Sequence, residues 1–336
     1  MSQPINIAVI GATGTVGETL VQILEERDFP LGTLHLLASI ESAGSSVAYR
    51  GKNLRVREVD AFDFSQVQLA FFAASPTVTL SFAPRAQAAG CAVIDLSGAL
   101  SAEQAPAVVP EANAALIAGL ASPKQLRSPS AAAVALAVAL APLKGLLELE
   151  RVQLTACLAV SAQGREAVNE LARQTAELLN ARPLEPRFFD RQMAFNLLAQ
   201  VGASDDAGHG VLERRLVAEL RELLDLPLLK ISVTCVQVPV FFGDSYSVSL
   251  HSRTAVDLAA VNAALESAEG VELVDAGDYP TPVGDAVGQD VVYVGRVRGG
   301  IDEAEQLNLW LTTDNVRKGA ALNAVQLAEL LIKDLA

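Results

Sequence analysis

The stretch "INIAVIGATGTVGETLVQILEE", residues 5–26, places a strand, a glycine turn and a helix in immediate succession. Its first six residues are mostly β-branched, and the residues after the turn have the apolar spacing of an amphipathic helix. Between them, Gly11, Gly14 and Gly17 lie three residues apart. Glycine permits positive φ and lets a pyrophosphate and the helix approach the backbone closely. The stretch therefore predicts a dinucleotide-binding turn, with an ordinary tight βα turn as the alternative.

Strands and helices continue to alternate after this stretch. Short apolar runs occur at "LHLLAS" (34–39), "LAFFAAS" (69–75) and "CAVIDLS" (91–97), and Thr77–Ala89 has helical spacing. Such alternation is typical of a parallel sheet with right-handed crossovers. We therefore predict a Rossmann-type α/β domain over residues 1–129.

The second half of the chain has a different pattern. Several runs alternate with period two, and amphipathic segments accompany them. This predicts an α+β domain over residues 130–313, with a mixed or antiparallel sheet and helices on one side. A helix over 314–336 is predicted to complete the first domain. The expected strands cover 151–160, 230–241, 245–252 and 307–313, and the expected helices cover about 166–181, 211–225 and 256–268.

Composition limits the class of protein. The chain has 336 residues, of which 51% are hydrophobic, and this suits a two-domain globular protein. Its net charge of -14 argues against nucleic acid or an acidic membrane as a partner. The three cysteines form no CxxC pair, so we expect neither a disulfide framework nor a metal site. The N-terminus lacks signal-peptide features, and the longest apolar run, 131–143, is too short to cross a bilayer, so we expect a soluble cytoplasmic protein.

A helix start lies at "SPSAAAVAL", residues 128–136. The Ser-Pro turn and Ser130 as N-cap precede an alanine-rich helix. Free N–H groups and the helix dipole make such a start suitable for binding an anion or for lowering the pKa of a thiol. The first helical positions, however, carry only methyl groups.

Nine segments spread over the whole chain carry a family pattern. They are "GATGTVGETL", "SAG" (42–44), "VVPEAN" (108–113), "AVALAPLKGL", "AVSAQG", "AFNLLAQVG", "VTCVQVPVFFGDS", "YPTPVGDAVGQDVVYVGRVR" and "DNVRKGAALNAVQLAELL". In these segments the chain resembles the aspartate-β-semialdehyde dehydrogenase family, and in particular its Usg-type paralogues, which lack the active-site cysteine. The resemblance implies a Rossmann domain, a substrate and dimerisation domain, and a role in amino-acid biosynthesis. The family reaction is the NADPH-linked reduction of an acyl phosphate through a cysteine thioester.

The resemblance places the family's nucleophile and base at altered residues. Ala131 stands at the cysteine and Ser130 at the preceding asparagine. A methyl group forms no thioester, and losing a covalent nucleophile costs on the order of 10⁴–10⁶ in rate. Asp244 stands at the histidine base. An aspartate with its usual pKa of about 3.9 is a poor proton shuttle at neutral pH unless it is buried.

Other positions implied by the resemblance are altered too. Gln237 replaces the arginine that holds the substrate carboxylate, and Ser101 replaces the phosphate-binding arginine. Leu158 replaces a glutamine, and Leu212 and Arg215 stand at the family's Glu-x-x-Lys pair, so that only Arg215 keeps its charge. These changes predict that the family reaction is absent.

A substitute nucleophile would rescue the chemistry. Cys157 precedes Leu158 on a predicted strand, where alternation turns it to the opposite face. Cys235 lies in a hydrophobic strand, where a core role is expected. Ser130 has no histidine placed by sequence to activate it. None of the three is expected to take over.

The positions that match the family's cofactor contacts keep suitable residue types. The residue at the position that selects NADP in the family is Glu41 instead of arginine. A carboxylate repels the 2′-phosphate and accepts ribose hydroxyls, which favours NAD over NADP if a dinucleotide binds. The alternative for Glu41 is a solvated loop charge. The matching positions are Gly11, Thr13, Gly14, Thr15, Val16, Gly17, Ser42, Ser161, Ala162 and Asn315.

Two classes of function follow. The first is a non-catalytic or regulatory homologue that forms a homodimer, or a heteromer with an active family member. The second is an NAD-dependent oxidoreductase that acts on a less anionic substrate without a thioester, with Asp244 as acid or base. A purely structural protein is a more distant alternative.

Overall fold

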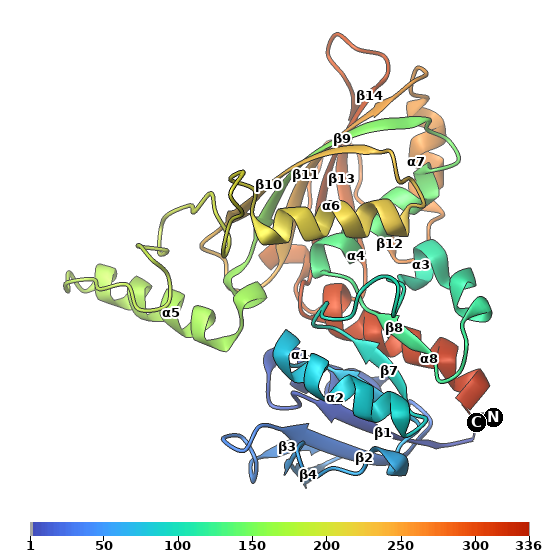
Figure 1. Cartoon of the computed structure of the whole chain (residues 1–336). Helices are drawn as coiled ribbons and strands as arrows, with labels where there is room; N and C mark the ends of the chain where they lie inside the picture. Colours follow the sequence, from blue (N-terminus) through green and yellow to red (C-terminus); the bar gives the residue numbers. More distant parts are fainter. Residues whose placement is uncertain (1–2, 336) are drawn as a thin grey trace. The chain divides into compact units, whose positions relative to one another are not determined.

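The computed structural model describes residues 3–335 and contains two units (Figure 1). One unit comprises the chain up to Ser130 together with the chain from Ala320 onward, and the other is Ala131–Gly319. The division predicted from the sequence differs slightly, because it places Ser130 in the second domain and residues 314–319 in the first. The functional assignment of the two domains stays a prediction.

A six-stranded parallel sheet forms the centre of the first unit, and this confirms the predicted Rossmann-type architecture. Its strand order is β5-β2-β1-β6-β7-β8, with the crossover beside β1 that is typical of doubly wound sheets. The strands are β1 (Ile5–Ile10), β2 (Leu31–Ala38), β5 (Arg57–Glu58), β6 (Leu69–Phe72), β7 (Ala92–Asp95) and β8 (Gln125–Arg127).

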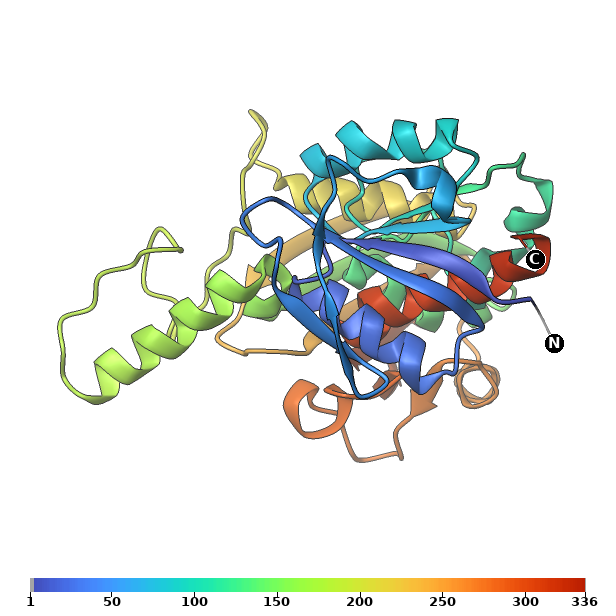
Figure 2. The ribbon, with the colours of Figure 1, turned by 90° about the horizontal axis from the view of Figure 1, so that it is seen from below.

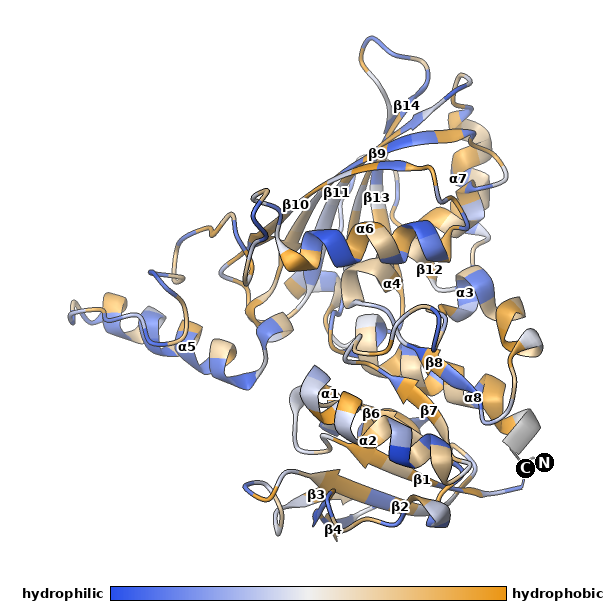
Figure 3. Cartoon of the chain, viewed as in Figure 1, coloured by the Kyte–Doolittle hydropathy of each residue, from blue (hydrophilic) through white to orange (hydrophobic). Residues whose placement is uncertain are grey.

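Helices cover both faces of this sheet (Figure 2). Helices α1 (Thr15–Glu26) and α8 (Asn323–Leu335) pack on one face, and α2 (Pro76–Ala88) packs on the other. The strands between them are strongly hydrophobic (Figure 3). The remaining elements of this unit are β3 (Ser46–Tyr49), β4 (Lys52–Arg55), η1 (Phe64–Gln66), α3 (Pro110–Asn113) and η2 (Ala114–Gly119).

The second unit contains a mixed six-stranded sheet in the order β10-β9-β11-β14-β13-β12. Two pairs, β9–β10 and β12–β13, are parallel, and the other pairs are antiparallel, so the predicted mixed sheet is confirmed. The strands are β9 (Leu149–Leu158), β10 (Lys230–Gln237), β11 (Asp244–Ser252), β12 (Val271–Leu273), β13 (Val292–Gly299) and β14 (Gln306–Thr313).

Alternation along these strands separates a helix-covered face from a largely uncovered one, on which the chain at Pro280 packs against Trp310. On β9, Val152, Leu154 and Ala156 are buried, whereas Gln153 and Thr155 are exposed. The covered face packs against α4 and α6. The other elements of this unit and of the chain that leaves it are α4 (Ala131–Leu140), η3 (Ala141–Leu143), η4 (Val160–Gln163), α5 (Arg165–Leu179), α6 (Val211–Leu223), α7 (Leu258–Glu266), η5 (Pro282–Ala286) and η6 (Arg317–Leu322).

The C-terminal helical segment begins later than the sequence predicts. Helical turns start with η6 at Arg317, so Asn315 lies in a turn after β14. The Asp314 carboxylate accepts hydrogen bonds from the N–H groups of Val316 (2.9 Å) and Arg317 (2.8 Å). A local side-chain cap of this kind holds the chain out of the helix at 314–316. Within residues 3–335, no helix is both long and apolar enough to span a membrane.

Candidate cofactor and substrate sites

The glycine turn of the first unit leaves no space for side chains at two positions. Gly11 has φ of 86°, and a Cβ atom there would lie 2.4 Å from the carbonyl oxygen of Ala73. A Cβ atom on Gly17 would lie 2.1 Å from the carbonyl oxygen of Gly11. The turn therefore brings α1 directly against the end of β1, as a pyrophosphate-binding turn requires.

The same turn presents the start of α1. Gly14 is the N-cap and provides no side-chain cap, and its N–H donates to the carbonyl oxygen of Gly11 at 3.0 Å. Thr15 and Val16 are the first helical residues, and Thr13 lies in the turn before them. First-turn N–H groups have no partner inside a helix, and the dipole favours an anion beside them. This geometry suits a phosphate group.

Glu41 lies in a turn beyond the end of β2, the strand next to β1. Its side chain is exposed, and Ser42 beside it is partly buried. The turn is closed by the N–H of Ala43, which donates to Ser39 at 3.0 Å. In doubly wound folds an acidic residue at this strand end accepts the ribose hydroxyls of a bound dinucleotide.

Ser101 follows β7 in the same unit and closes a polar turn. Its N–H donates to Gln104 Oε1 at 3.0 Å, and the side chain is exposed. The preceding loop is held by the buried Asp95 carboxylate, which accepts from the N–H groups of Ser97 (2.7 Å) and Leu100 (2.9 Å). A hydroxyl at this strand end supplies no positive charge for a phosphate.

In the second unit, the start of α4 packs against the turn that follows β14. Ala131 is the first residue of α4, and its Cβ lies so close to Gly319 that a Cβ on that glycine would be 2.6 Å away. Gly319 in turn donates its N–H to the carbonyl oxygen of Asp314 at 2.9 Å. The methyl group at the helix start therefore lies beside the 314–319 turn.

Asn315, in this turn, connects two further loops of the unit. Its Nδ2 donates to Ser161 Oγ at 3.0 Å, and its Oδ1 accepts from the N–H of Gly243 at 3.0 Å. Ala162 follows Ser161 in η4. The structure thus brings the predicted cofactor residues Ser161 and Asn315 into direct contact, although they are far apart in sequence.

Asp244 is the first residue of β11 and is 1% exposed. Its Oδ1 accepts from the N–H of Ala159 at 2.8 Å, and its Oδ2 accepts from the Tyr246 hydroxyl at 3.1 Å. Burial raises the pKa of Asp244 to about 7, although both hydrogen bonds oppose the rise and the charge of Asp314 adds to it. Because Asp244 is buried and its pKa is raised, its carboxyl can accept and release a proton near neutral pH.

The cysteines lack the environment of a reactive thiolate. Burial raises the pKa of Cys91 to about 12 in the first unit and that of Cys235 to about 12 in the second. Cys157 is half-buried on the sheet face opposite Leu158, and burial followed by the charge of Asp244 raises its pKa. All three are therefore thiols at neutral pH.

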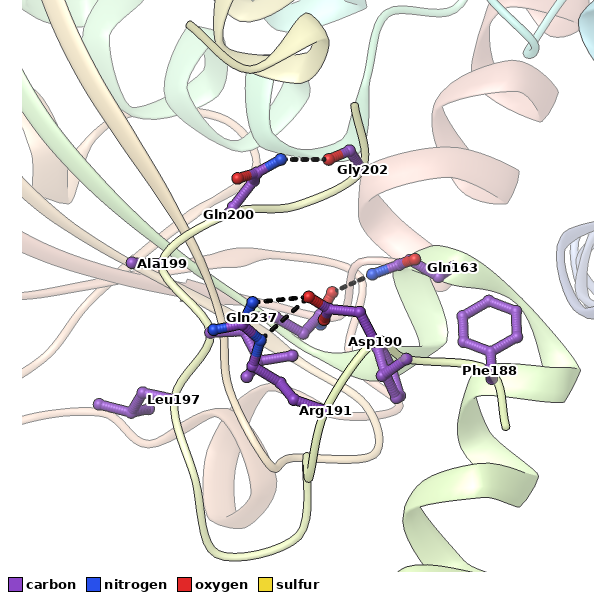
Figure 4. Close-up of a pocket in the computed structure, with 11 residues that line it drawn as sticks. Gln163, Phe188, Asp190, Arg191, Leu197, Ala199, Gln200, Gly202 and Gln237 are labelled. Carbon is purple, nitrogen blue, oxygen red and sulfur yellow. Dashed lines mark hydrogen bonds and ion pairs between the residues drawn. The ribbon is translucent and has the colours of Figure 1, made fainter. Parts of the chain in front are cut away.

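Gln237 ends β10 and is completely buried. Its Nε2 donates to the carbonyl oxygen of Leu158 at 2.6 Å, and its Oε1 accepts from Gln163 Nε2 at 2.5 Å. These contacts place the Gln237 amide at a cleft of about 610 Å³ (Figure 4). The cleft is lined by Gln163, Phe188, Phe189, Asp190, Arg191, Leu197, Leu198, Ala199, Gln200, Gly202 and Gln237.

The pair Leu212 and Arg215 lies near the start of α6. Arg215 Nε donates to Glu219 Oε1 at 2.7 Å, one turn further along the same helix. Leu212 is half-buried. The retained positive charge at Arg215 is therefore engaged by a neighbouring carboxylate.

The predicted residues of the second unit gather at one end of its sheet. Leu158 and Gln237 end parallel strands β9 and β10, Asp244 begins β11, and Asn315 follows β14. Sequence reasoning missed Tyr246 and Gln163, the hydrogen-bond partners of Asp244 and Gln237. The available signals are that Tyr246 lies two residues after Asp244 and so shares its strand face, and that Gln163 lies in the family-like segment "AVSAQG". No cluster of three metal-ligating side chains occurs among the described residues.

Two family models match the chain. The model described as "Semialdehyde dehydrogenase, NAD binding domain" matches residues 6–120. The model described as "Semialdehyde dehydrogenase, dimerisation domain" matches residues 140–318. Together they account for both units.

Two relatives are similar to this chain over nearly their full length. The "USG-1 protein homolog" of Azotobacter vinelandii is 62% identical over 333 residues, which are 99% of each chain. The "Aspartate-semialdehyde dehydrogenase 2" of Vibrio cholerae is 42% identical over 335 residues, again 99% of each chain.

Solved structures share the fold. "The structure of a probable aspartate-semialdehyde dehydrogenase from Pseudomonas aeruginosa" superposes with a TM-score of 0.97 at 60% identity, covering 98% of this chain and 99% of that one. Aspartate semialdehyde dehydrogenase II of Vibrio cholerae, in a structure titled as complexed with ASA, superposes with a TM-score of 0.96 at 42% identity, covering 99% of each chain.

Proposed function

Because this chain belongs to the aspartate-semialdehyde dehydrogenase family, we propose that it is a non-catalytic member that retains a binding site for NAD. The observation that carries the proposal is the methyl group of Ala131 at the start of α4, where the resemblance implies a cysteine nucleophile. Without a thiolate there, the thioester cannot form. The raised pKa values of all three cysteines support the absence of a substitute.

Loss of positive charge supports the same conclusion. The positions implied to bind the substrate carboxylate and phosphate are Gln237 and Ser101, and both are neutral. Gln237 is held by hydrogen bonds to Leu158 and Gln163 and cannot provide the two parallel donors of a guanidinium. An anionic acyl phosphate would therefore lose both of its main charge partners.

The residues present fit a dinucleotide. Gly11 and Gly17 form a close-packed turn in which a Cβ atom at either position would collide with the backbone. The start of α1, which follows this turn, suits a pyrophosphate. Glu41 favours NAD over NADP because its carboxylate repels a 2′-phosphate and accepts hydroxyls. When bound, NAD would supply a nicotinamide that accepts or donates hydride. Ser161, Ala162 and Asn315 are the proposed contacts on the nicotinamide side.

Self-association completes the proposal. The match to a dimerisation domain supports a homodimer built through the second unit, and we propose that this homodimer acts in the cytoplasm. A heteromer with an active family member is the alternative assembly. Co-purification of a tagged chain with an active homologue from the same host would favour the heteromer, and recovery of the chain alone would exclude it.

Two measurements test the proposal together. Calorimetric titration should show NAD⁺ binding at least about tenfold more tightly than NADP⁺, and Glu41→Arg should reverse that order. The family reaction, assayed with aspartate semialdehyde, phosphate and either cofactor, should give no turnover. Turnover that Ala131→Ser does not alter would reveal a different nucleophile. Turnover at a rate typical of enzymes would overturn the non-catalytic assignment.

Asp244 favours a second candidate, an NAD-dependent oxidoreductase that uses no thioester. Its buried carboxyl has a pKa of about 7 and a hydroxyl partner, so it suits a general acid or base. Screening neutral aldehydes and alcohols with NAD⁺ and NADH tests this candidate. Activity that changes in one step with a midpoint near pH 7 and is lost in Asp244→Asn would support it, and inactivity across the set would reject it.

A further inference from the structure

The cleft beside Gln237 has a polar floor that is only partly satisfied by the protein. A carboxamide offers two N–H donors and two acceptor lone pairs. In the described part of the chain, Gln237 Nε2 uses one donor on Leu158, and its Oε1 accepts one hydrogen bond, from Gln163. Gln237 is itself completely buried, so the amide that faces the cleft is that of half-buried Gln163, which in the same described residues uses one Nε2 N–H on Gln237 and keeps its second N–H and its Oε1 for a ligand. A ligand with a donor and an acceptor side by side matches them.

The charged side chains of the cleft are paired with each other at its rim and do not reach its floor. Arg191 provides the only guanidinium among the lining residues, and both its Nε (3.0 Å) and its Nη2 (2.7 Å) donate to Asp190 Oδ2. Each of these two side chains is 69% exposed, so they lie at the rim. A carboxylate moved to the Gln237 amide would lose its hydration without gaining a counter-charge.

Apolar side chains form a wall of the cleft. The rings of Phe188 and Phe189 pack edge to face with centroids 5.0 Å apart, and Leu197 and Leu198 also line the cavity. Leu198 is tied to the end of β10 by two backbone hydrogen bonds with Gln237, of 3.1 and 2.8 Å. The wall and the amide floor are therefore held together. Phe188 is 38% exposed and Leu197 is 63% exposed, so apolar surface remains for a ligand to cover.

From these contacts we propose that the cleft binds a small, uncharged molecule that carries a carboxamide on an apolar body. The amide lies against the Gln163–Gln237 pair, and the apolar body lies against Phe188 and Leu197. A volume of about 610 Å³ is within the range of small-molecule sites. The proposal concerns binding alone, and it holds whether or not the chain binds NAD or catalyses any reaction.

Benzamide and benzoate test this proposal because they have nearly the same shape and differ in charge. Ligand-observed NMR titration of the full chain at pH 7.5 should detect benzamide binding in the millimolar range, at least about tenfold more tightly than benzoate. Gln237→Arg should reverse the preference because it restores a cation at the floor. Gln87→Arg adds the same charge on the exposed surface of α2 in the other unit and serves as the matched control, which should leave the preference for benzamide unchanged.

The position of the bound benzamide is determined from the protein's NMR spectrum, in which the side-chain amide signals of Gln163 and Gln237 should shift. If Gln237→Arg does not fold, Gln163→Leu replaces it, and about fivefold weaker benzamide binding is expected because the partner of Gln237 is removed. Equal or tighter binding of benzoate to the unmodified chain would overturn the proposal. Failure of both probes to bind at 10 mM, roughly the weak limit for such fragments, would do the same. NAD titrations are unaffected by either result, so the two proposals fail separately.

Discussion

Burial decides the chemistry of Asp244. The side chain lies among β-strand residues at one end of the second sheet, and its two oxygen atoms accept hydrogen bonds from Ala159 and Tyr246. Desolvation outweighs these bonds and raises its pKa to about 7 from an ordinary 3.8. A residue that suggests a permanent anion in the sequence is therefore close to half-protonated at neutral pH.

This raised pKa predicts a pH-dependent stability. The unfolded chain releases the Asp244 proton near pH 4 and the folded chain near pH 7, so the contribution of the buried carboxyl is complete below pH 4 and is lost as pH rises through 7. Asp244→Asn removes the ionisable group, so the variant does not lose unfolding free energy through this group as the pH rises. Relative to the unmodified chain, the variant should gain on the order of a few kcal/mol in unfolding free energy between pH 4 and pH 8. Denaturant unfolding at both pH values measures the gain, with exposed Asp206→Asn as the control. Parallel pH profiles would contradict the assignment.

Ala131 gives a second prediction at the scale of a residue. Ala131→Cys places a thiol at the start of α4, where N–H groups and the helix dipole lower its pKa. We expect iodoacetamide to alkylate it at least about tenfold faster than the buried cysteines of the unmodified chain. Turnover in the family reaction should still be absent because Gln237 and Ser101 provide no cation.

Ala135→Cys is the control for that experiment because Ala135 is completely buried in the middle of the same helix. Its thiol should react slowly. Turnover restored by Ala131→Cys alone would show that the cysteine was the only missing group.

At the scale of an element, the turn between β1 and α1 keeps its shape because Gly17 of the helix packs directly against the carbonyl oxygen of Gly11. Gly17→Ala would put a methyl group 2.1 Å from the carbonyl oxygen of Gly11, so α1 must move away from the strand. Overpacking of this kind costs about 1–3 kcal/mol of unfolding free energy and would displace the proposed phosphate site.

Thermal and denaturant unfolding measure the stability effect, and calorimetry should show weaker NAD⁺ binding. Gly119→Ala is the matched control because its Cβ would meet open space, and a change within about 0.5 kcal/mol is expected. Unchanged NAD⁺ affinity in a folded Gly17→Ala protein would exclude the turn from the cofactor site.

At the scale of the molecule, the uncovered face of the second sheet suits self-association. The chain has 39 acidic residues, yet alternation places none of them on this face within strands β9, β10, β11 and β14. These four strands therefore form an acid-free part of the face, where two strongly acidic chains can approach without direct repulsion, whereas Glu272 on β12 lies toward the far edge of the same face. Its exposed or half-buried side chains include Arg151, Gln153, Thr155, Lys230, Ser232, Thr234, Ser247, Ser249, His251, Gln306, Asn308 and Trp310.

Thr155→Asp tests this face because a two-fold homodimer built on it would bring two new charges into one interface. Sedimentation velocity should show a dimer for the unmodified chain and a shift toward monomer for the variant. Ala218→Asp, on the exposed side of α6, adds the same charge away from the face and should leave the dimer intact. A dimer that persists in Thr155→Asp would place the interface elsewhere.

The sequence by itself determined the parallel first sheet, the mixed second sheet and the positions of the main helices. These depend on local periodicity and on glycine spacing, as in residues 5–26. It did not predict that the helical turns begin only at Arg317, because the cap by the Asp314 carboxylate competes with helical hydrogen bonding there. It also gave no separate signal for β13, where a bulge at Gly295–Arg298 interrupts the alternation.

The chemistry of individual side chains was decided by the tertiary structure. Asp244 meets Ala159 across 85 residues of sequence, and Gln237 meets Leu158 across 79. Sequence identifies such residues as altered, but the loss of water around them determines whether a carboxyl is charged or an amide is free. Desolvation depends on which distant strands pack together, and local sequence patterns do not contain that information.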